Sequence, residues 1–382
     1  MIKRIPILLF IFLLIFIYSK DEKFMSKTII IGTSIPQTGT IKALGDSVVN
    51  GASSYFNFVN DNHILGEKKI RFLVYDDKYE PDLSTQNTNK LIFKDNAFAL
   101  FSLVGTPTVK SILPILHDEN IPFFAAFSGA SFLRNNQNKN IVNFRSSYSQ
   151  EIEAIVSHLH EKEGLDSIAV FYQNDDYGEE GYISILKSLQ KRNLKLVAQG
   201  SYKRNTLSIN HAFNEIKDAK PQAIIMVGAY KTNALFIKKA KQNENLKDVI
   251  FANLSFGDAD EMIKELKRQK TNTNNLLFSQ VVPNYTNSDI PVVLQYQKLM
   301  KKYHPNEKLG FVSLESFLAA KVLVNAIYLI KDDLTREKFL CNLQETPKTL
   351  LDGINLEYKN TQLLNKVYLF HYENSKFVEV EK

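Results

Sequence analysis

The sequence contains no tryptophan and only one cysteine, Cys341, among its 382 residues. A single cysteine excludes a disulfide within the chain, and so few cysteines are compatible with an oxidising compartment. Residues 339–343, Phe-Leu-Cys-Asn-Leu, have the character of the apolar side of a helix. We therefore expect Cys341 to be a buried thiol that packs as a small hydrophobic side chain, and not a nucleophile.

Long runs of one charge are also missing, although the formal net charge is +6. The densest lysine clusters, at 238–241 and 298–302, fall on segments with helical periodicity. Such clusters are typical of solvated helix faces and are too short to follow a phosphate backbone. Nucleic acid is therefore not an expected partner.

Motifs for catalysis and for metal binding are missing as well. The sequence shows no glycine-rich phosphate loop and no Ser–His–Asp arrangement. His158 and His160 are two residues apart, which places them on different faces of a helix and argues against shared metal ligation. Asp76 and Asp77 end a predicted strand, where carboxylates usually accept hydrogen bonds from loop N–H groups. We therefore predict no enzymatic activity, no cofactor and no metal.

The N-terminus predicts export. Lys3 and Arg4 precede a largely apolar run over 5–18, which has the form of a secretory signal over residues 1–20. The run is brief for a membrane span, which needs about 20 residues. Its end has no pair of small residues for cleavage, so an uncleaved anchor that tethers the chain to the membrane is the alternative. No cysteine follows it for lipid attachment. We expect a periplasmic location in either case.

Short β-rich runs alternate with amphipathic helical segments through most of the chain. The first set of strands is expected at 28–31, 70–75, 98–103 and 122–125, with helices at 47–60, 91–93 and 109–116. The alternation restarts near Ile152, with strands at 167–171, 194–198, 223–227, 249–252 and 276–281 and helices at 181–189 and 232–240. Helices of this length between strands form right-handed crossovers, which give a parallel sheet covered on both faces. Two such sets predict two doubly wound α/β lobes.

The C-terminal third begins with a linker at 283–288 and continues with helical segments at 292–303 and 314–329. Two short strands at 367–370 and 377–380 follow, and a turn at 373–375 joins them. We expect these strands to pair as a hairpin.

Open parallel sheets bind ligands at the carboxyl ends of their strands, so the residues after each strand carry the most information. Thr106 follows one strand and is placed to cap the next helix. Phe127, Ser128 and Gly129 follow the next strand and open a second predicted helix. Ser and Gly leave backbone N–H groups uncovered, and two helix N-termini aimed at one point form an anion site. Two ordinary helix caps without a ligand are the alternative.

The second lobe has tyrosines at the corresponding places. Tyr177 follows the strand that ends near Tyr172, and Tyr230 follows the strand that ends at Val227. A tyrosine at a strand end can cover a ligand with apolar area and offer it a hydroxyl group. A single tyrosine in a loop is usually a packing residue, but four matched strand ends favour a ligand site between the lobes.

The ordered motifs of the chain resemble those of the branched-chain amino-acid binding family, the type I periplasmic binding proteins of ABC importers. The resemblance runs from about Ile31 to Lys359 and rests on segments 32–39, 76–81, 121–124, 143–145 and 176–181. It implies that Thr106, Phe127, Ser128 and Gly129 hold a ligand carboxylate or its equivalent. It also implies that Tyr177 and Tyr230 close over the ligand from the other lobe.

Two departures from the family pattern concern the ligand. Ser255 stands where the amino-acid binders place an acid against the ligand ammonium group, and such a charge-assisted partner contributes about 1.5–3 kcal/mol. Either Asp258 replaces that acid or the ligand lacks an ammonium group. Phe127 stands where the family usually has a small residue, which narrows or reshapes the site.

The resulting prediction is a type I periplasmic binding protein with two doubly wound lobes joined by a three-crossover hinge. The first lobe takes 27–146 and 281–353, and the second takes 147–280 and 354–382. By closing this hinge, the chain would capture a small polar molecule, an amino acid or a related carboxylate or amide, for an ABC permease. The alternative is a sensing module that presents the bound ligand to a receptor or kinase.

Overall fold

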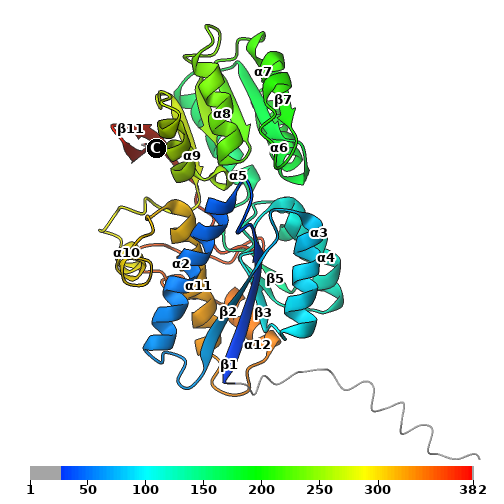
Figure 1. Ribbon diagram of the computed structural model, residues 1–382, viewed down its shortest axis with the longest axis vertical. Coiled ribbons are helices and arrows are strands. Elements are labelled where there is room, and N and C mark those ends of the chain that lie inside the picture. The colour runs from blue at the N-terminus through cyan, green and yellow to red at the C-terminus, as the bar shows by residue number, and fades with distance from the viewer. Residues whose placement is uncertain (1–26, 381–382) are drawn as a thin grey trace, which may run out of the picture.

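The computed structural model describes residues 27–380, and the predicted signal or anchor at 1–20 lies outside them. Two α/β lobes lie one above the other, each built on its own sheet (Figure 1). The strands of the first sheet all come from residues 28–142, and those of the second from residues 168–379. This arrangement confirms the predicted fold class.

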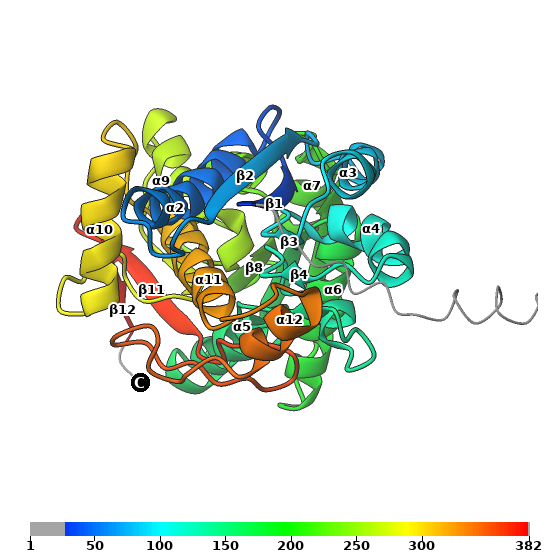
Figure 2. The ribbon, with the colours of Figure 1, turned by 90° about the horizontal axis from the view of Figure 1, so that it is seen from below.

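The first sheet has the strand order β2-β1-β3-β4-β5, and every pair in it is parallel. Its strands are β1 (Thr28–Ile35), β2 (Lys69–Asp76), β3 (Ala99–Phe101), β4 (Phe123–Phe124) and β5 (Ile141–Val142). Its helices are α2 (Lys42–Asp61), α3 (Pro81–Asn89) with the π-turn η2 (Lys90–Lys94), α4 (Thr106–Asp118) and the 3₁₀ turn η3 (Ser131–Arg134). Figure 2 shows α2 on one side of the sheet and α3 and α4 on the other. The chain turns back at β1, so the sheet is doubly wound.

The second sheet has the order β12-β11-β10-β9-β8-β6-β7. Its parallel strands are β6 (Ile168–Gln173), β7 (Leu196–Tyr202), β8 (Ala223–Val227), β9 (Ile250–Asn253) and β10 (Leu276–Gln280). The helices are α5 (Tyr148–Ser157) with the π-turn η4 (His158–Lys162), α6 (Asp176–Gln190), α7 (Asn210–Lys217), α8 (Tyr230–Lys241), η5 (Ser255–Gly257) and α9 (Ala259–Arg268). The predicted hairpin forms an antiparallel edge, β11 (Tyr368–Glu373) and β12 (Lys376–Glu379).

Three further helices complete the first lobe: α10 (Pro291–Tyr303), α11 (Phe311–Tyr328) and α12 (Arg336–Gln344). The α11 helix packs along α2 (Figure 2), and nearly all of its residues are buried. Its length and composition alone would suit a membrane span, but its burial is that of a core helix. Cys341 lies on α12 as predicted, but it is exposed. The expectation of a buried thiol is therefore wrong, because Phe339 and Leu343 are the residues of this helix that face the core.

Two of the segments that connect the sheets run side by side. Asn143 and Phe144 exchange backbone hydrogen bonds with residues 361–364 of the C-terminal segment, and Ser146 donates to the Leu364 carbonyl at 3.2 Å. The lobe boundaries themselves stay a prediction. These bonds favour placing residues 354–364 with the first lobe, so that the last crossing comes after Leu364.

Candidate functional site

The carboxyl ends of both parallel sheets face the junction between the lobes, where the predicted site residues are buried. Thr106, Ser128 and Tyr148 form a group of hydroxyls on the first lobe and at the crossing. Thr106 Oγ1 lies 2.9 Å from Ser128 Oγ and 3.4 Å from the Tyr148 hydroxyl oxygen. All three side chains are fully buried. Thr106 is the first residue of α4. Gly105 takes the cap position that the sequence analysis assigned to Thr106.

The segment after β4 differs from the expected helix N-terminus. It leads only to the four-residue turn η3, and three of its amide groups already have partners. Phe127 donates to the Leu103 carbonyl at 2.9 Å, Ala130 to Ser128 Oγ at 3.3 Å and Ser131 to Glu180 at 3.0 Å.

Gly129 is needed for close packing. A Cβ at this position would lie 2.6 Å from the backbone nitrogen of Tyr148, so no larger residue fits without a backbone shift. This glycine therefore seats Tyr148 beside Thr106 and Ser128.

Arg145 is the central charge of the junction, and the sequence analysis did not select it as a site residue. Its guanidinium lies 4.4 Å from the centre of the Phe127 ring, and its Nε lies 3.3 Å from Oε1 of Glu315 on α11. Nη2 donates to the Ser255 hydroxyl. Nη1 is buried with no hydrogen-bond partner in the described part of the chain.

The charges of Glu315 and Glu151 keep Arg145 protonated. Burial alone would lower the pKa of Arg145, but these two neighbouring carboxylates outweigh that effect and raise it. Burial raises the pKa of Glu315 to about 7, against the opposing attraction of Arg145. The junction therefore holds a permanent cation whose partners are largely desolvated.

Ser255 connects the arginine to Glu151 on α5. Its backbone N–H donates to Glu151 Oε2 at 2.9 Å, and its hydroxyl donates to Oε1 at 3.0 Å. Ser279 donates to the same carboxylate at 2.6 Å. Ser255 therefore stands in a complete hydrogen-bond chain, in which it positions Arg145 and Glu151.

Aromatic rings from both lobes meet around Phe256, which the sequence analysis also missed. Its ring centroid lies 4.6 Å from that of Tyr177, 6.0 Å from Phe127 and 6.1 Å from Tyr79. Tyr177 also contacts Tyr148 at 5.1 Å between centroids. Its hydroxyl is buried without a hydrogen-bond partner in the described residues, and burial raises its pKa well above the ordinary value.

Tyr230 and Asp258 form a second group, beside α2. Both are buried, and the N–H of Ala43 in α2 interacts with the Tyr230 hydroxyl. Asp258 caps α9 by accepting from the Glu261 N–H at 3.1 Å, while its Oδ2 has no partner among the described residues. Burial raises the pKa of Asp258 to about 8, so this carboxyl is largely neutral at pH 7.

One groove of the described surface lies between the two lobes. Asp258 lines a groove of about 290 Å³ between α2, α9 and residues 308–312. A larger hollow of about 740 Å³ lies on the outside of α6 and β7 and contains none of the predicted site residues. Of these two hollows, the smaller one therefore lies at the junction and contains a predicted site residue.

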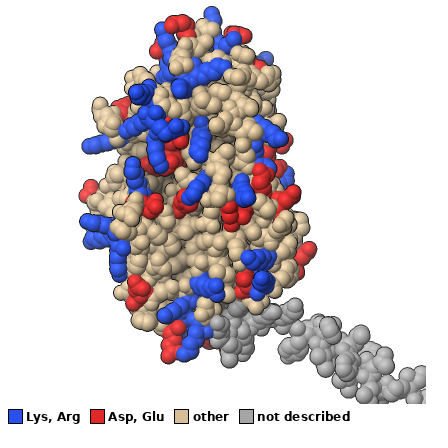
Figure 3. All heavy atoms as spheres, in the orientation of Figure 1, with Lys and Arg blue, Asp and Glu red and all other residues tan. Residues whose placement is uncertain are grey.

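Polar contacts between the lobes surround the buried groups. Arg204 binds Glu80 at 2.9 Å, and Gln173 Nε2 donates to the Tyr79 hydroxyl at 3.1 Å. Lys110 pairs with Asp176 across the same gap. Acidic and basic side chains lie side by side across the middle of the face shown in Figure 3. The described structure is therefore a closed form, held at its rim by exposed and half-buried pairs.

Asp76 and Asp77 have the structural role that the sequence analysis expected. Asp76 Oδ1 accepts from the N–H groups of Gln37 at 2.9 Å and Lys78 at 3.0 Å. Asp77 accepts from the Tyr79 N–H at 2.9 Å and from Ser34 Oγ at 2.9 Å. These carboxylates fix the turns that carry Tyr79 to the junction.

Two α/β lobes that close over buried polar atoms define a two-lobed solute-binding protein. The chain belongs to the periplasmic binding protein family, whose profile matches residues 28–376. The family has a solute-binding fold that takes small molecules, which points to a location outside the cytoplasm. The resemblance drawn from the sequence is therefore confirmed.

Curated and solved relatives agree with this assignment. The Leu/Ile/Val-binding protein homolog 7 of Brucella abortus (strain 2308) is 22% identical over 321 residues, covering 80% of this chain and 78% of the relative. A possible leucine/isoleucine/valine-binding protein from Rhodopirellula baltica SH 1 has a TM-score of 0.86 and 28% identity, covering 96% of this chain and 98% of that one. A solute-binding protein of an ABC transporter from R. palustris, solved with benzoate, has a TM-score of 0.80 and 18% identity, covering 92% and 95%.

Proposed function

We propose that this chain captures a small carboxylate, an amino acid or a related acid or amide, between its lobes in the periplasm and delivers it to an ABC importer. One observation carries the proposal: Arg145 Nη1 and the Tyr177 hydroxyl are buried at the junction without a partner among the described residues. Leaving a buried polar group unpaired costs about 1–3 kcal/mol, and more for a charged one. A ligand oxygen that accepts from both groups would remove that cost in the closed form.

The neighbouring side chains support a carboxylate or carboxamide at this point. A guanidinium donates from a planar set of N–H groups that matches a carboxylate, and these charge-assisted bonds are the stronger class. Tyr148 and Tyr177 both interact electrostatically with Arg145, so the arginine and the phenols share one region. The rings of Phe127, Phe256 and Tyr79 would then surround the apolar part of the ligand.

An ammonium group on the ligand is not required by this arrangement. Ser255 is engaged with Arg145 and Glu151, and the carboxyl of Asp258 lies in the second group beside α2. The benzoate-bound relative from R. palustris supports this point, since benzoate has a carboxylate and no ammonium group. We therefore favour a carboxylate with an apolar or aromatic remainder over a zwitterion.

Closure of the hinge would complete the site. The ligand carboxylate would first meet Arg145 and the cluster of hydroxyls that includes Thr106 and Ser128. The second lobe would then bring Tyr177 and Phe256 over the ligand. Rim pairs such as Arg204 with Glu80 hold this state. The closed form presents both lobes in one fixed orientation, which a permease can recognise.

The proposal is tested by identifying small molecules that stay bound through purification, using mass spectrometry after denaturation. A thermal-shift screen of amino acids, amides and carboxylates follows, because a ligand at 100 times its Kd adds about 2.7 kcal/mol. We expect carboxylates among the hits, and we expect Ser128→Ala and Tyr177→Phe to reduce the shift. Retained ligands or hits that lack both a carboxylate and a carboxamide would contradict the proposal.

A further inference from the structure

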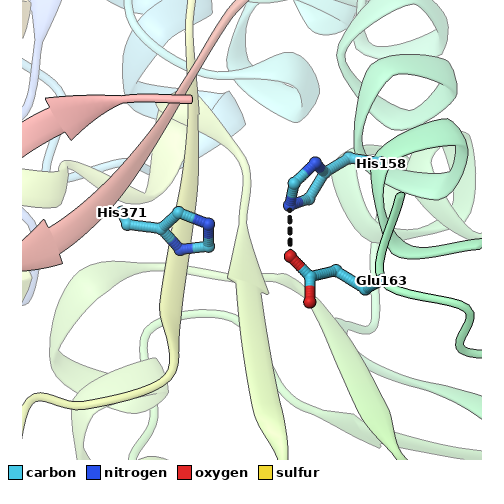
Figure 4. Close-up of side chains that lie close together, drawn as sticks. All are labelled: His158, Glu163 and His371. Carbon is cyan, nitrogen blue, oxygen red and sulfur yellow. Dashed lines mark ion pairs between the residues drawn. The ribbon is translucent and has the colours of Figure 1, made fainter. Parts of the chain in front are cut away.

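His158, Glu163 and His371 form a cluster of metal-ligating side chains in the second lobe (Figure 4). His158 belongs to the π-turn η4 at the end of α5, Glu163 follows that turn directly, and His371 lies on β11. Each residue offers one nitrogen or oxygen, and these three atoms lie within 4.8 Å of one another. Figure 4 shows the His371 ring directed from the hairpin toward the other two side chains.

The π-turn explains why this cluster could not be recognised from the sequence. In an α-helix, residues five apart do not share a face. Here the Glu163 N–H donates to the His158 carbonyl at 3.1 Å, which is the hydrogen bond of a π-turn and widens the helix by one residue. His160, the neighbour considered from the sequence, is instead engaged with Asp166, 2.6 Å from its Nδ1.

The geometry of the first two side chains matches a tetrahedral ion. His158 Nε2 lies 3.4 Å from Glu163 Oε1, and ligands about 2.0–2.1 Å from a tetrahedral zinc ion are about 3.4 Å apart. His158 is only 7% exposed, and its Nε2 has no hydrogen-bond partner in the described part of the chain. The rings of His158 and His371 have centroids 5.6 Å apart, and the candidate ligand atom of His371 lies within 4.8 Å of those of His158 and Glu163.

We propose that His158, Glu163 and His371 bind a divalent transition-metal ion, with Zn²⁺ as the best fit. Two imidazole nitrogens and one carboxylate oxygen are a common zinc ligand set, which leaves the fourth position to water. Glu163 is 40% exposed, so ions can reach the buried nitrogen from solvent. The ion binds the edge hairpin β11–β12 to the end of α5, two elements far apart in the sequence.

This site is separate from the ligand junction. His371 pairs with Leu277 in β10, three residues before Gln280, where β10 reaches the junction. Three strand residues span about 10 Å. The metal therefore strengthens the second lobe without contacting the solute. Zinc binding can be tested independently of the proposed transport function.

The test is a zinc titration of the purified full chain after treatment with a chelator, followed by calorimetry and by metal analysis of the protein after gel filtration. We expect one zinc ion per chain and a melting temperature that rises with zinc. His371→Gln, His158→Gln and Glu163→Gln should each weaken zinc binding at least tenfold and abolish the rise. His371 is only partly buried, so its variant is the one expected to keep its fold if His158→Gln does not.

His160→Gln and His211→Gln are the matched controls. His160 belongs to the same π-turn, and His211 forms an exposed His–Glu pair with Glu215 at 3.2 Å. Both variants should bind zinc as the unaltered chain does. The proposal is overturned if the unaltered chain binds no zinc, if His371→Gln with an unchanged zinc-free melting temperature binds it equally well, or if His211→Gln abolishes binding.

Discussion

The guanidinium of Arg145 lies 4.4 Å from the centre of the Phe127 ring, so a cation from one hinge segment stacks on an aromatic residue that follows β4. This pair is fully buried, and the neighbouring Tyr177 hydroxyl has no hydrogen-bond partner among the described residues. Arg145 Nη1 also has no hydrogen-bond partner in the described part of the chain, and two buried, unpaired donors are costly in a ligand-free protein. The same arrangement is well suited to a small carboxylate.

Tyr177→Phe separates ligand binding from folding. The substitution removes a hydroxyl that has no partner in the described structure, so we expect the free energy of unfolding without ligand to stay the same or to rise. Ligand affinity should fall about tenfold, since one hydrogen bond contributes about 1–1.5 kcal/mol. Urea unfolding and calorimetric titration measure the two quantities.

Tyr202→Phe is the matched control for that substitution. The Tyr202 hydroxyl accepts from the Ala229 N–H at 2.9 Å and donates to Gln173 at 3.2 Å. Its loss should destabilise the ligand-free chain by about 1–2 kcal/mol. If Tyr177→Phe destabilises the free chain as much as Tyr202→Phe does and leaves affinity unchanged, Tyr177 is a packing residue only.

Arg145→Lys keeps the positive charge but removes the planar set of donors. We expect ligand affinity to fall about 10- to 100-fold, because a hydrogen bond to a charged group contributes about 1.5–3 kcal/mol. Arg192→Lys is the control, since Arg192 pairs with Glu153 and Glu161 within the second lobe. Equal calorimetric affinities of the two variants would exclude Arg145 from the ligand site.

Glu80→Gln weakens the contact that closes the rim. Glu80 binds Arg204 at 2.9 Å and accepts from Asn205 at 2.7 Å, both from the other lobe. We expect affinity to fall a few-fold, with a smaller effect at high salt, because exposed pairs contribute about 0.2–1 kcal/mol and are screened. Glu244→Gln, which affects a pair within one lobe, should leave affinity unchanged at every salt concentration. An equal response of both variants in titrations at low and high salt would show that the Glu80 contact does not control closure.

The raised pKa of the Asp258 carboxyl predicts that the stability of the fold depends on pH. Burial raises the pKa of Asp258 from the ordinary value of 3.8 to about 8. The charge of Asp260 adds to the rise, and the hydrogen bond from the Glu261 N–H opposes it. The folded chain therefore holds a proton that the unfolded chain releases, so this residue's contribution is complete below about pH 4 and is lost as the pH rises toward 8. The loss is on the order of a few kcal/mol.

Asp258→Asn keeps the helix cap and removes the titration. Urea unfolding at several pH values should show a smaller fall in stability between pH 5 and 8 for this variant than for the unaltered chain. Asp77, Asp260 and Glu315 have pKa values raised by burial in the same direction and provide the remaining slope. Identical slopes in the two proteins would mean that Asp258 is ionised in the folded state.

The fold could be predicted from the sequence because short local patterns of apolar residues indicate its strands and helices. The apolar run that begins at Thr28 predicted β1, and the run at 223–227 matched β8 residue for residue. The alternation of these runs with helices then fixed the parallel sheets. Cys341 was misplaced because a helical segment of five residues does not show which side faces the core.

The candidate site could be predicted only in part from such local patterns. Thr106, Ser128 and Tyr177 were selected because they follow strands, and all three are buried at the junction. Arg145 and Phe256 were missed because their importance depends on partners more than 50 residues away, such as Glu315 for the arginine and Tyr177 and Tyr79 for the ring. The segment 143–145 had drawn attention as a motif, but nothing local shows that its arginine is stacked and partly unpaired.

Calorimetric titration of the strongest ligand and of its methyl ester, against the unaltered chain and Tyr177→Phe, shows directly whether Arg145 and Tyr177 bind a carboxylate. We expect the unaltered chain to prefer the acid over the ester at least tenfold. We also expect Tyr177→Phe to lose affinity for the acid while its ligand-free stability is kept. Equal affinity for acid and ester in both proteins would contradict the binding of a carboxylate by Arg145 and Tyr177.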